Sequence, residues 1–236
     1  MSISMNKTLS IRPPYLASSV QDRVPVELEK LYRRTRTHVT DADKMIGIEL
    51  LIEANCDMID TGFMALLDEL TRTNPGLNLQ DAQTTIEDVK AKARHYIRWV
   101  GGFIANDRLP PVIAHYYEMM HHLDLGDGMK SYMAFNISKE FAADLDRVLQ
   151  TLADGTTRDL DEMVNLLVRV FEETMQPLLI KPKDLMKFNF IVDKTINGVI
   201  SVVTALYARM LRKTVPKLPR ELYPQVAEHL GTFLVT

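Results

Sequence analysis

Two adjacent histidines near the middle of the chain are the residues whose type and spacing most directly suggest chemistry. They end an amphipathic segment, His115-Tyr-Tyr-Glu-Met-Met-His121-His122, and Gly126 follows four residues later. The segment holds one Glu-x-x-His motif, Glu118 to His121, whereas a di-metal carboxylate bundle requires two such motifs. No other histidine in the sequence supplies the second motif, which disfavours a di-metal site. A single histidine that projects into an apolar slot between helices remains, and such a histidine can hold haem iron.

Hydrolysis with a histidine as the base is a second chemical interpretation. Serine and aspartate are plentiful, but no nucleophile lies in a stretch that predicts a strained turn. We therefore expect that the protein is not an enzyme. A row of carboxylates at helical spacing could bind metal, although a solvated helix face is the usual role of such a row. The row comprises Glu49, Glu53, Asp57 and Asp60.

The composition limits the compartment and the partners. A net charge of −3 gives no basic field for nucleic acid. Cys56 is the single cysteine, so the chain can form no internal disulfide, and a reducing compartment fits. The first residues lack the apolar core of a signal peptide, and the longest uncharged run, Thr195 to Ala208, is too short to span a bilayer as a helix. We therefore predict a cytoplasmic protein without a membrane partner.

Apolar residues at helical spacing recur along most of the chain and predict an all-α fold of seven or eight helices with an N-terminal extension. Gly62 marks a possible bend, so residues 41–73 form either one helix or two in tandem. A β-hairpin at Asn197-Gly198 is the rival to the last long helix, but no other segment offers a partner sheet. The predicted helices span residues 26–37, 41–73, 80–105, 110–122, 129–153, 159–180 and 183–213.

The surroundings of the second histidine also carry a family pattern. His122 is followed by two residues, the aliphatic Leu125, Gly126 and, several residues later, the aromatic Tyr132. This spacing resembles the proximal-histidine motif of the globin-coupled sensor family, and the similarity covers about residues 40–213. Further similarities are the acidic start at Thr40-Asp-Ala-Asp43, the late aromatic Phe63, the helix-ending Pro75, the basic helix from Lys90 to Trp99, and the last helix from Met186 through Tyr207.

The resemblance implies a globin-like fold that holds haem b, with His122 as the iron ligand and His121, one residue off the family spacing, as the alternative. The family commonly has an oxygen-binding tyrosine where this chain has Met64. The resemblance therefore places the apolar Met64, Val89 and Ala93 on the distal side of the haem, and Lys90, Arg94 or Arg98 beside its propionates. The haem-binding residues that it implies are His122, Met64, Phe63, Ile86, Val89, Ala93, Arg94, Arg98 and Tyr132.

The function that the resemblance implies is sensing of a diatomic gas, O2, CO or NO. The helices at about 129–153 and 184–213 would pair with a second subunit and pass the signal to an output domain or partner protein. The alternative is a haem-free globin-like module for signalling or scaffolding that acts by protein–protein contacts. The expected organisation is a tail at residues 1–24, a sensor domain at 25–213, and a linker with a short helix at 214–236.

Overall fold

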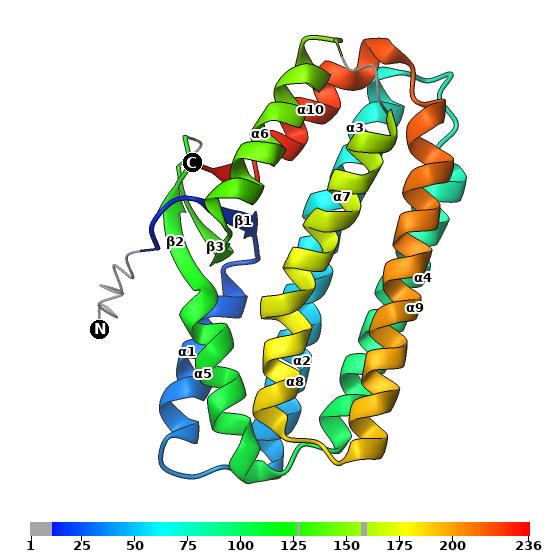
Figure 1. Cartoon of the computed structure of the whole chain (residues 1–236). Coiled ribbons are helices and arrows are strands. Elements are labelled where there is room, and N and C mark those ends of the chain that lie inside the picture. The colour runs from blue at the N-terminus through cyan, green and yellow to red at the C-terminus, as the bar shows by residue number, and fades with distance from the viewer. Residues whose placement is uncertain (1–10, 127, 157–159) are drawn as a thin grey trace.

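The computed structural model describes residues 11–126, 128–156 and 160–236, and long helices that run side by side dominate it (Figure 1). The structure is 74 % helical, which confirms the all-α class with an N-terminal extension, whereas the globin-like arrangement stays a prediction. In chain order the helices are α1 (Arg23–Thr35), α2 (Asp41–Ile59), α3 (Ala65–Thr73), α4 (Gln80–Gly102), α5 (Leu109–Met119), α6 (Lys139–Ala153), α7 (Leu160–Met175), α8 (Lys181–Met186), α9 (Phe190–Thr214) and α10 (Tyr223–Gly231).

Two of the helices continue through π-helical turns. The segment η1 (Asp60–Met64) joins α2 to α3 and contains Gly62, so residues 41–73 form one helix with an irregular turn where a bend was predicted. The segment η3 (Gln176–Ile180) contains Pro177 and joins α7 to α8. Proline removes a backbone donor, which explains why the regular hydrogen-bond pattern stops there. The predicted first residue of this helix, Asp159, lies outside the described residues.

The long helices α2, α4, α7 and α9 form the body that surrounds the candidate site. Helix α2 packs on α4, α7 packs on α9, and α4 also contacts α9 (Figure 1). The start of α2 is defined locally, because the Thr40 side chain accepts from the Asp43 amide and the Asp43 carboxylate accepts from the Thr40 amide. This capping box satisfies two backbone donors that the first helical turn leaves open.

A four-stranded antiparallel sheet closes one side of the bundle, and its strands were not predicted. The strands β1 (Tyr15–Ser19), β2 (Met120–Asp124), β3 (Met129–Asn136) and β4 (Leu234–Val235) have the order β2-β3-β1-β4.

Predicting helix through residue 122 and again from residue 129 was therefore wrong. A hairpin joins β2 and β3, and Gly126 and Gly128 have φ values of 109° and 93°, which favour glycine. Strand β3 ends at Asn136, and α6 begins at Lys139.

Both chain ends contribute to this sheet. The predicted tail at 1–24 is wrong for its described part, since β1 is buried and α1 already begins at Arg23. The predicted linker at 214–236 contains α10, as expected, and also β4. The alternative hairpin at Asn197-Gly198 is wrong, because both residues lie inside α9.

Helix α9 is unusually apolar for a helix with so much exposed surface. The helix from Phe190 to Lys217 is the one helix in the described ranges that is long and apolar enough to cross a membrane by length and composition. Only 17 % of its most apolar stretch is buried, whereas Phe190, Ile191 and Val202 are 79 %, 76 % and 59 % exposed. The side chains of α9 therefore divide between an inner face, toward α7 and α4, and an uncovered outer face.

Candidate functional site

A cavity of about 280 Å³ lies between the four long helices, and its walls are almost wholly apolar. Helices α2, α4, α7 and α9 each supply several side chains, and strands β1 and β3 add a few more. Representative lining residues are Leu51, Val89, Phe171, Ile196, Val203 and Phe135. Such an apolar cavity between helices is a common place for a small-molecule site.

Four of the residues that the resemblance implies for haem binding meet in this cavity. Phe63, Ile86, Val89 and Ala93 all line it, and they come from η1 and α4. Met64, one position after Phe63, does not line the cavity and packs instead against the neighbouring hydrophobic core. These four residues therefore share one apolar cavity, and Met64 lies outside it.

The predicted proximal residues lie elsewhere. His122 is exposed on β2, with its Nδ1 3.3 Å from the hydroxyl of Ser131, and it does not line the cavity. Tyr132 is buried against Tyr15 and Ala17 in a small cluster on the sheet. His121 is buried next to a separate cleft. The chain changes from helix to strand at Met120, which moves these side chains away from the bundle, and the residues of the cavity do not fit a haem held by His122.

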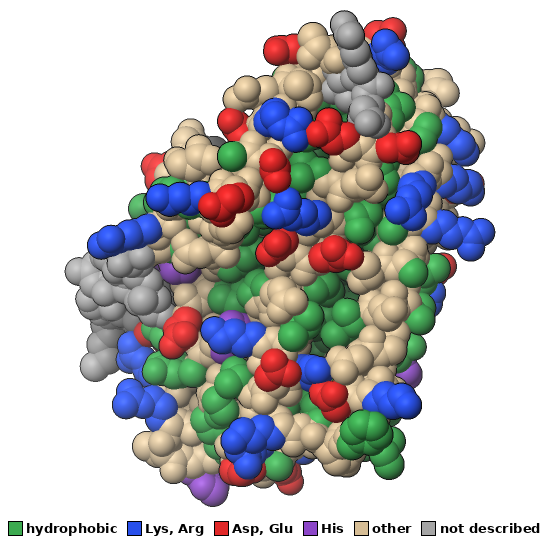
Figure 2. Space-filling view, viewed as in Figure 1, with side chains coloured by type: hydrophobic (Ala, Val, Ile, Leu, Met, Phe, Trp, Pro, Cys, Tyr) green, Lys and Arg blue, Asp and Glu red, His purple; other side chains and the backbone are tan. Residues whose placement is uncertain are grey.

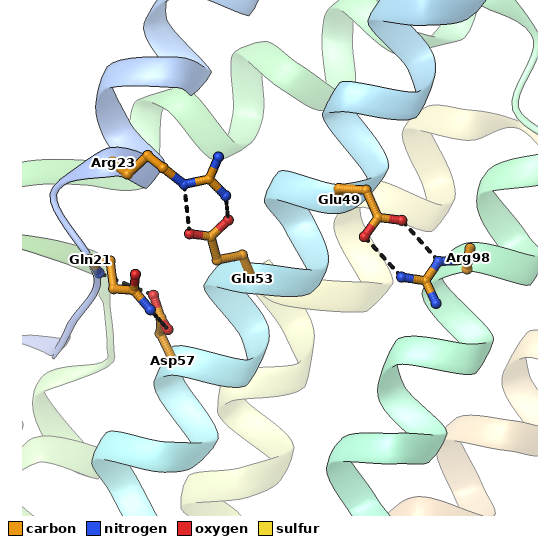
Figure 3. A network of polar contacts seen from close by, with 6 residues as sticks. All are labelled: Gln21, Arg23, Glu49, Glu53, Asp57 and Arg98. Carbon is orange, nitrogen blue, oxygen red and sulfur yellow. Dashed lines mark hydrogen bonds and ion pairs between the residues drawn. The ribbon is translucent and has the colours of Figure 1, made fainter.

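The two arginines predicted at the haem propionates are on the exposed side of α4. Arg98 forms two hydrogen bonds with the Glu49 carboxylate, each 2.9 Å long (Figure 3). These bonds lower the pKa of Glu49 against the effect of partial desolvation. Arg98 therefore links α4 to α2. Arg94 is exposed and does not line the cavity.

The carboxylate row on α2 likewise forms ion pairs and hydrogen bonds with neighbouring elements. Glu53 pairs with Arg23 at the start of α1, and Asp57 accepts hydrogen bonds from the backbone and side chain of Gln21 at 3.0 and 3.1 Å (Figure 3). Asp60 pairs with the buried Lys90 of α4 at 2.5 Å. Within the described residues no group of three or more His, Cys, Asp or Glu side chains could hold a metal ion. The row is thus explained by contacts between elements.

A more polar cleft of about 520 Å³ lies between α5, β3 and the end of α7, and its lining includes His115, Glu118, His121, Glu173 and Lys181. The Glu-x-x-His motif of the sequence falls here. His115 lies 2.7 Å from the carbonyl oxygen of Pro177, so its Nε2 carries a hydrogen and donates. Its role is to bind the backbone of the π-helical turn.

Ser131, Asp22 and His122 resemble a catalytic triad only in composition. The Ser131 hydroxyl is 2.7 Å from the Asp22 carboxylate, and the residue is 1 % exposed. Because this hydroxyl donates its one hydrogen to the carboxylate, the histidine cannot act as its base. The contact holds β3 to the start of α1.

Most polar groups around the main cavity are satisfied by nearby backbone. Asn55, Thr85 and Thr174 donate to carbonyl groups one turn earlier in their own helices. Ser18 of β1 differs, because its Oγ is buried without a hydrogen-bond partner among the described residues. Sequence reasoning missed Ser18, since it was assigned to the tail. A five-residue strand in which four residues in a row are buried carries no alternation to reveal it.

No protein-family model matches the chain, and no curated protein or solved structure matches it.

Proposed function

We propose that this protein binds an elongated, apolar small molecule in the cavity between α2, α4, α7 and α9. The observation that carries the proposal is the almost wholly apolar wall of a cavity of about 280 Å³. An apolar occupant would take the apolar walls out of contact with water, which is favourable by about 25 cal/mol per Å² of apolar surface buried.

The shape of the cavity favours a chain-like occupant. Its lining extends on α4 from Thr85 to Gly101 and on α9 from Ile196 to Met210. At about 1.5 Å of rise per residue, the lined length is roughly 20 Å. An apolar space that extends this far along the helices suits an acyl or isoprenoid chain better than a compact molecule.

The haem sensor that the sequence resemblance implies is a different proposal. The geometry favours the apolar ligand over it, because the expected iron ligand His122 is exposed on β2. The apolar residues predicted for the distal wall serve either occupant equally well.

The uncovered face of α9 supports a second candidate function, which is self-association. Phe190, Ile191 and Val202 are large apolar residues on this face, and exposed apolar patches mark interaction sites. A homodimer through α9 was also expected from the sequence. The two functions are compatible, since Val202 does not line the cavity.

A pair of alanines on α4 gives a matched test of ligand binding. Ala93 lines the cavity, whereas Ala91 is exposed on the same helix and does not. We expect the apolar dye N-phenyl-1-naphthylamine to bind the wild type saturably. Ala93→Trp should weaken dye binding by about tenfold or more because the indole fills the cavity, and Ala91→Trp should leave it unchanged. Ala93→Leu serves the same purpose if the tryptophan variant does not fold.

Two outcomes of this experiment would reject the proposal: no saturable binding to the wild type, or equal binding by the two tryptophan variants. The same preparations, expressed with added haem precursor, should be scanned for a Soret band. A Soret band that is lost in His122→Ala and retained in His121→Ala would restore the haem sensor instead.

A further inference from the structure

We propose that the ligand is a neutral amphiphile with one hydroxyl or carbonyl group, and that the Ser18 hydroxyl is the hydrogen-bond partner of that group. The inference rests on the proposed function and names the chemistry of its ligand. It starts from a polar group that the protein leaves unsatisfied at the wall of an apolar cavity.

Ser18 lines the cavity and is 6 % exposed, and its Oγ has no hydrogen-bond partner among the described residues. Buried hydroxyl groups in folded proteins are nearly always hydrogen-bonded, so an exception calls for an explanation. A buried water would need two or more polar partners, and the surrounding walls are apolar. A ligand that carries its own oxygen atom supplies the missing partner.

The strand geometry indicates that Ser18 faces the helices. Side chains alternate along a strand, so Leu16 and Ser18 share one face of β1, and Leu16 belongs to the large core formed with the helices. Tyr15 and Ala17 occupy the other face and pack on Tyr132 and Ala134 of β3. The next serine, Ser19, lies 3.5 Å from the Thr61 hydroxyl and does not line the cavity.

The charges around the cavity favour a neutral ligand. Lys183 is the one charged lining residue in the described part of the chain. Its Nζ lies 2.9 Å from the Asp193 carboxylate and 2.9 Å from the Asn197 side-chain oxygen. A ligand carboxylate would therefore have to compete with Asp193 for this cation or be buried without a partner, and both are unfavourable.

A second hydroxyl, that of Tyr207 on α9, must be distinguished from Ser18. The Tyr207 ring stacks on Phe171 at 4.4 Å and meets Phe63 edge-on at 5.4 Å. Burial raises the pKa of Tyr207, so it stays a neutral hydroxyl at physiological pH. We assign the ligand oxygen to Ser18, because its Oγ is the one buried side-chain oxygen or nitrogen atom without a hydrogen-bond partner among the described residues.

The test compares three ligands that share one chain length: dodecanol, dodecane and dodecanoate. Each displaces N-phenyl-1-naphthylamine from the wild type, from Ser18→Ala, and from the control Ser19→Ala. We expect the wild type to prefer dodecanol over both others. Ser18→Ala should lose about tenfold in affinity for dodecanol while its affinity for dodecane stays the same, since one hydrogen bond to the ligand is lost. Ser19→Ala should behave as the wild type.

Several results would overturn the inference. An equal loss for dodecanol and dodecane in Ser18→Ala would show an effect of packing alone. A preference for dodecanoate would exclude a neutral ligand. A loss of the dodecanol preference in Tyr207→Phe but not in Ser18→Ala would show that the ligand oxygen bonds to Tyr207 of α9 and not to Ser18. In all three cases dye binding by the wild type, and with it the proposed function, would stand, whereas an absence of any binding would reject both.

Discussion

His115 lies where α5 meets the π-helical turn η3, and its surroundings set its protonation. Burial, assisted by Lys181, lowers the pKa of His115 below its usual 6.5, and the Pro177 carbonyl and Glu118 oppose this only in part. Near and below pH 6.5 the unfolded chain therefore binds more protons than the folded protein. Stability from this group is present above the unfolded pKa of 6.5 and is lost as the pH falls through the lowered pKa of the folded state.

We accordingly expect the free energy of unfolding to decrease as the pH falls from roughly 7.5 to 5.5. His115→Gln keeps a side-chain N–H for the Pro177 carbonyl but cannot take up a proton, so it should show a smaller decrease. Urea unfolding at stepped pH values measures both slopes. His38→Gln, at an exposed histidine, is the control and should follow the wild type. Identical slopes for the wild type and His115→Gln would contradict the argument.

How well the candidate site could be predicted differs residue by residue. Phe63, Ile86, Val89 and Ala93 were predicted together and do line one cavity. Helical periodicity specifies which side chains share an inner face, so such a group can be read from sequence. The role of Ser18 could not, because it depends on a strand whose partners lie more than a hundred residues away. His122 failed as a cavity residue for a different reason, because the chain forms strand β2 of a local hairpin where a helix end was predicted.

Among the elements, the helices were predictable and the sheet was not. Capping residues and apolar spacing specify helices locally, as Thr40 does for α2. Strand β3 has Met133 and Phe135 on one face and Tyr132 and Ala134 on the other, which is the period of a strand. Its eight residues run almost directly into α6, so the pattern merged with that of the helix. Strands β1 and β4, which pair with each other, come from opposite ends of the chain.

The approach of α4 to α2 depends on one glycine. A Cβ atom at Gly101 would collide with two atoms of the Ile48 side chain, whereas one at Gly102 would meet nothing within 4 Å. We expect Gly101→Ala to lower the free energy of unfolding by about 1–3 kcal/mol, because overpacking forces the two helices apart. Gly102→Ala should be neutral or slightly stabilising, since alanine favours helix over glycine by up to about 1 kcal/mol.

Urea denaturation of the two glycine variants measures this difference directly. Because Gly101 also lines the cavity, dye binding should weaken in Gly101→Ala and persist in Gly102→Ala. If both variants were equally stable, the close contact between α2 and α4 would not be a feature of the folded protein.

At the scale of the whole molecule, the helix pairs α2–α4 and α7–α9 enclose apolar space and also leave apolar surface outside. The ion pairs that connect the helices lie around the outside of this space, and they join Arg98 to Glu49 and Lys90 to Asp60. Hydrogen bonds to Asp60 and Glu87 raise the pKa of Lys90 although burial alone would lower it. The space-filling view shows apolar side chains exposed between charged ones along one face (Figure 2). An inner apolar cavity and an outer apolar patch are thus separate features of one bundle.

The outer face of α9 leads to the last prediction. Val202 is 59 % exposed and lies on the same side of the helix as Ile191, about three turns away, since positions eleven residues apart nearly coincide around the axis. If this face forms a homodimer, the protein should show a dimer mass by light scattering at micromolar concentration. Val202→Lys should shift it to monomer, because a lysine buried at an interface without a partner is unfavourable.

Ala143→Lys places the same charge on the exposed face of α6, the other region expected at the interface, and should leave the dimer intact. If the dimer dissociates in Ala143→Lys and not in Val202→Lys, the interface lies on α6 and not on α9. A monomer mass for the wild type would contradict the proposal that the protein forms a dimer. Co-sedimentation of that monomer with vesicles would then indicate that the apolar face of α9 binds a membrane surface.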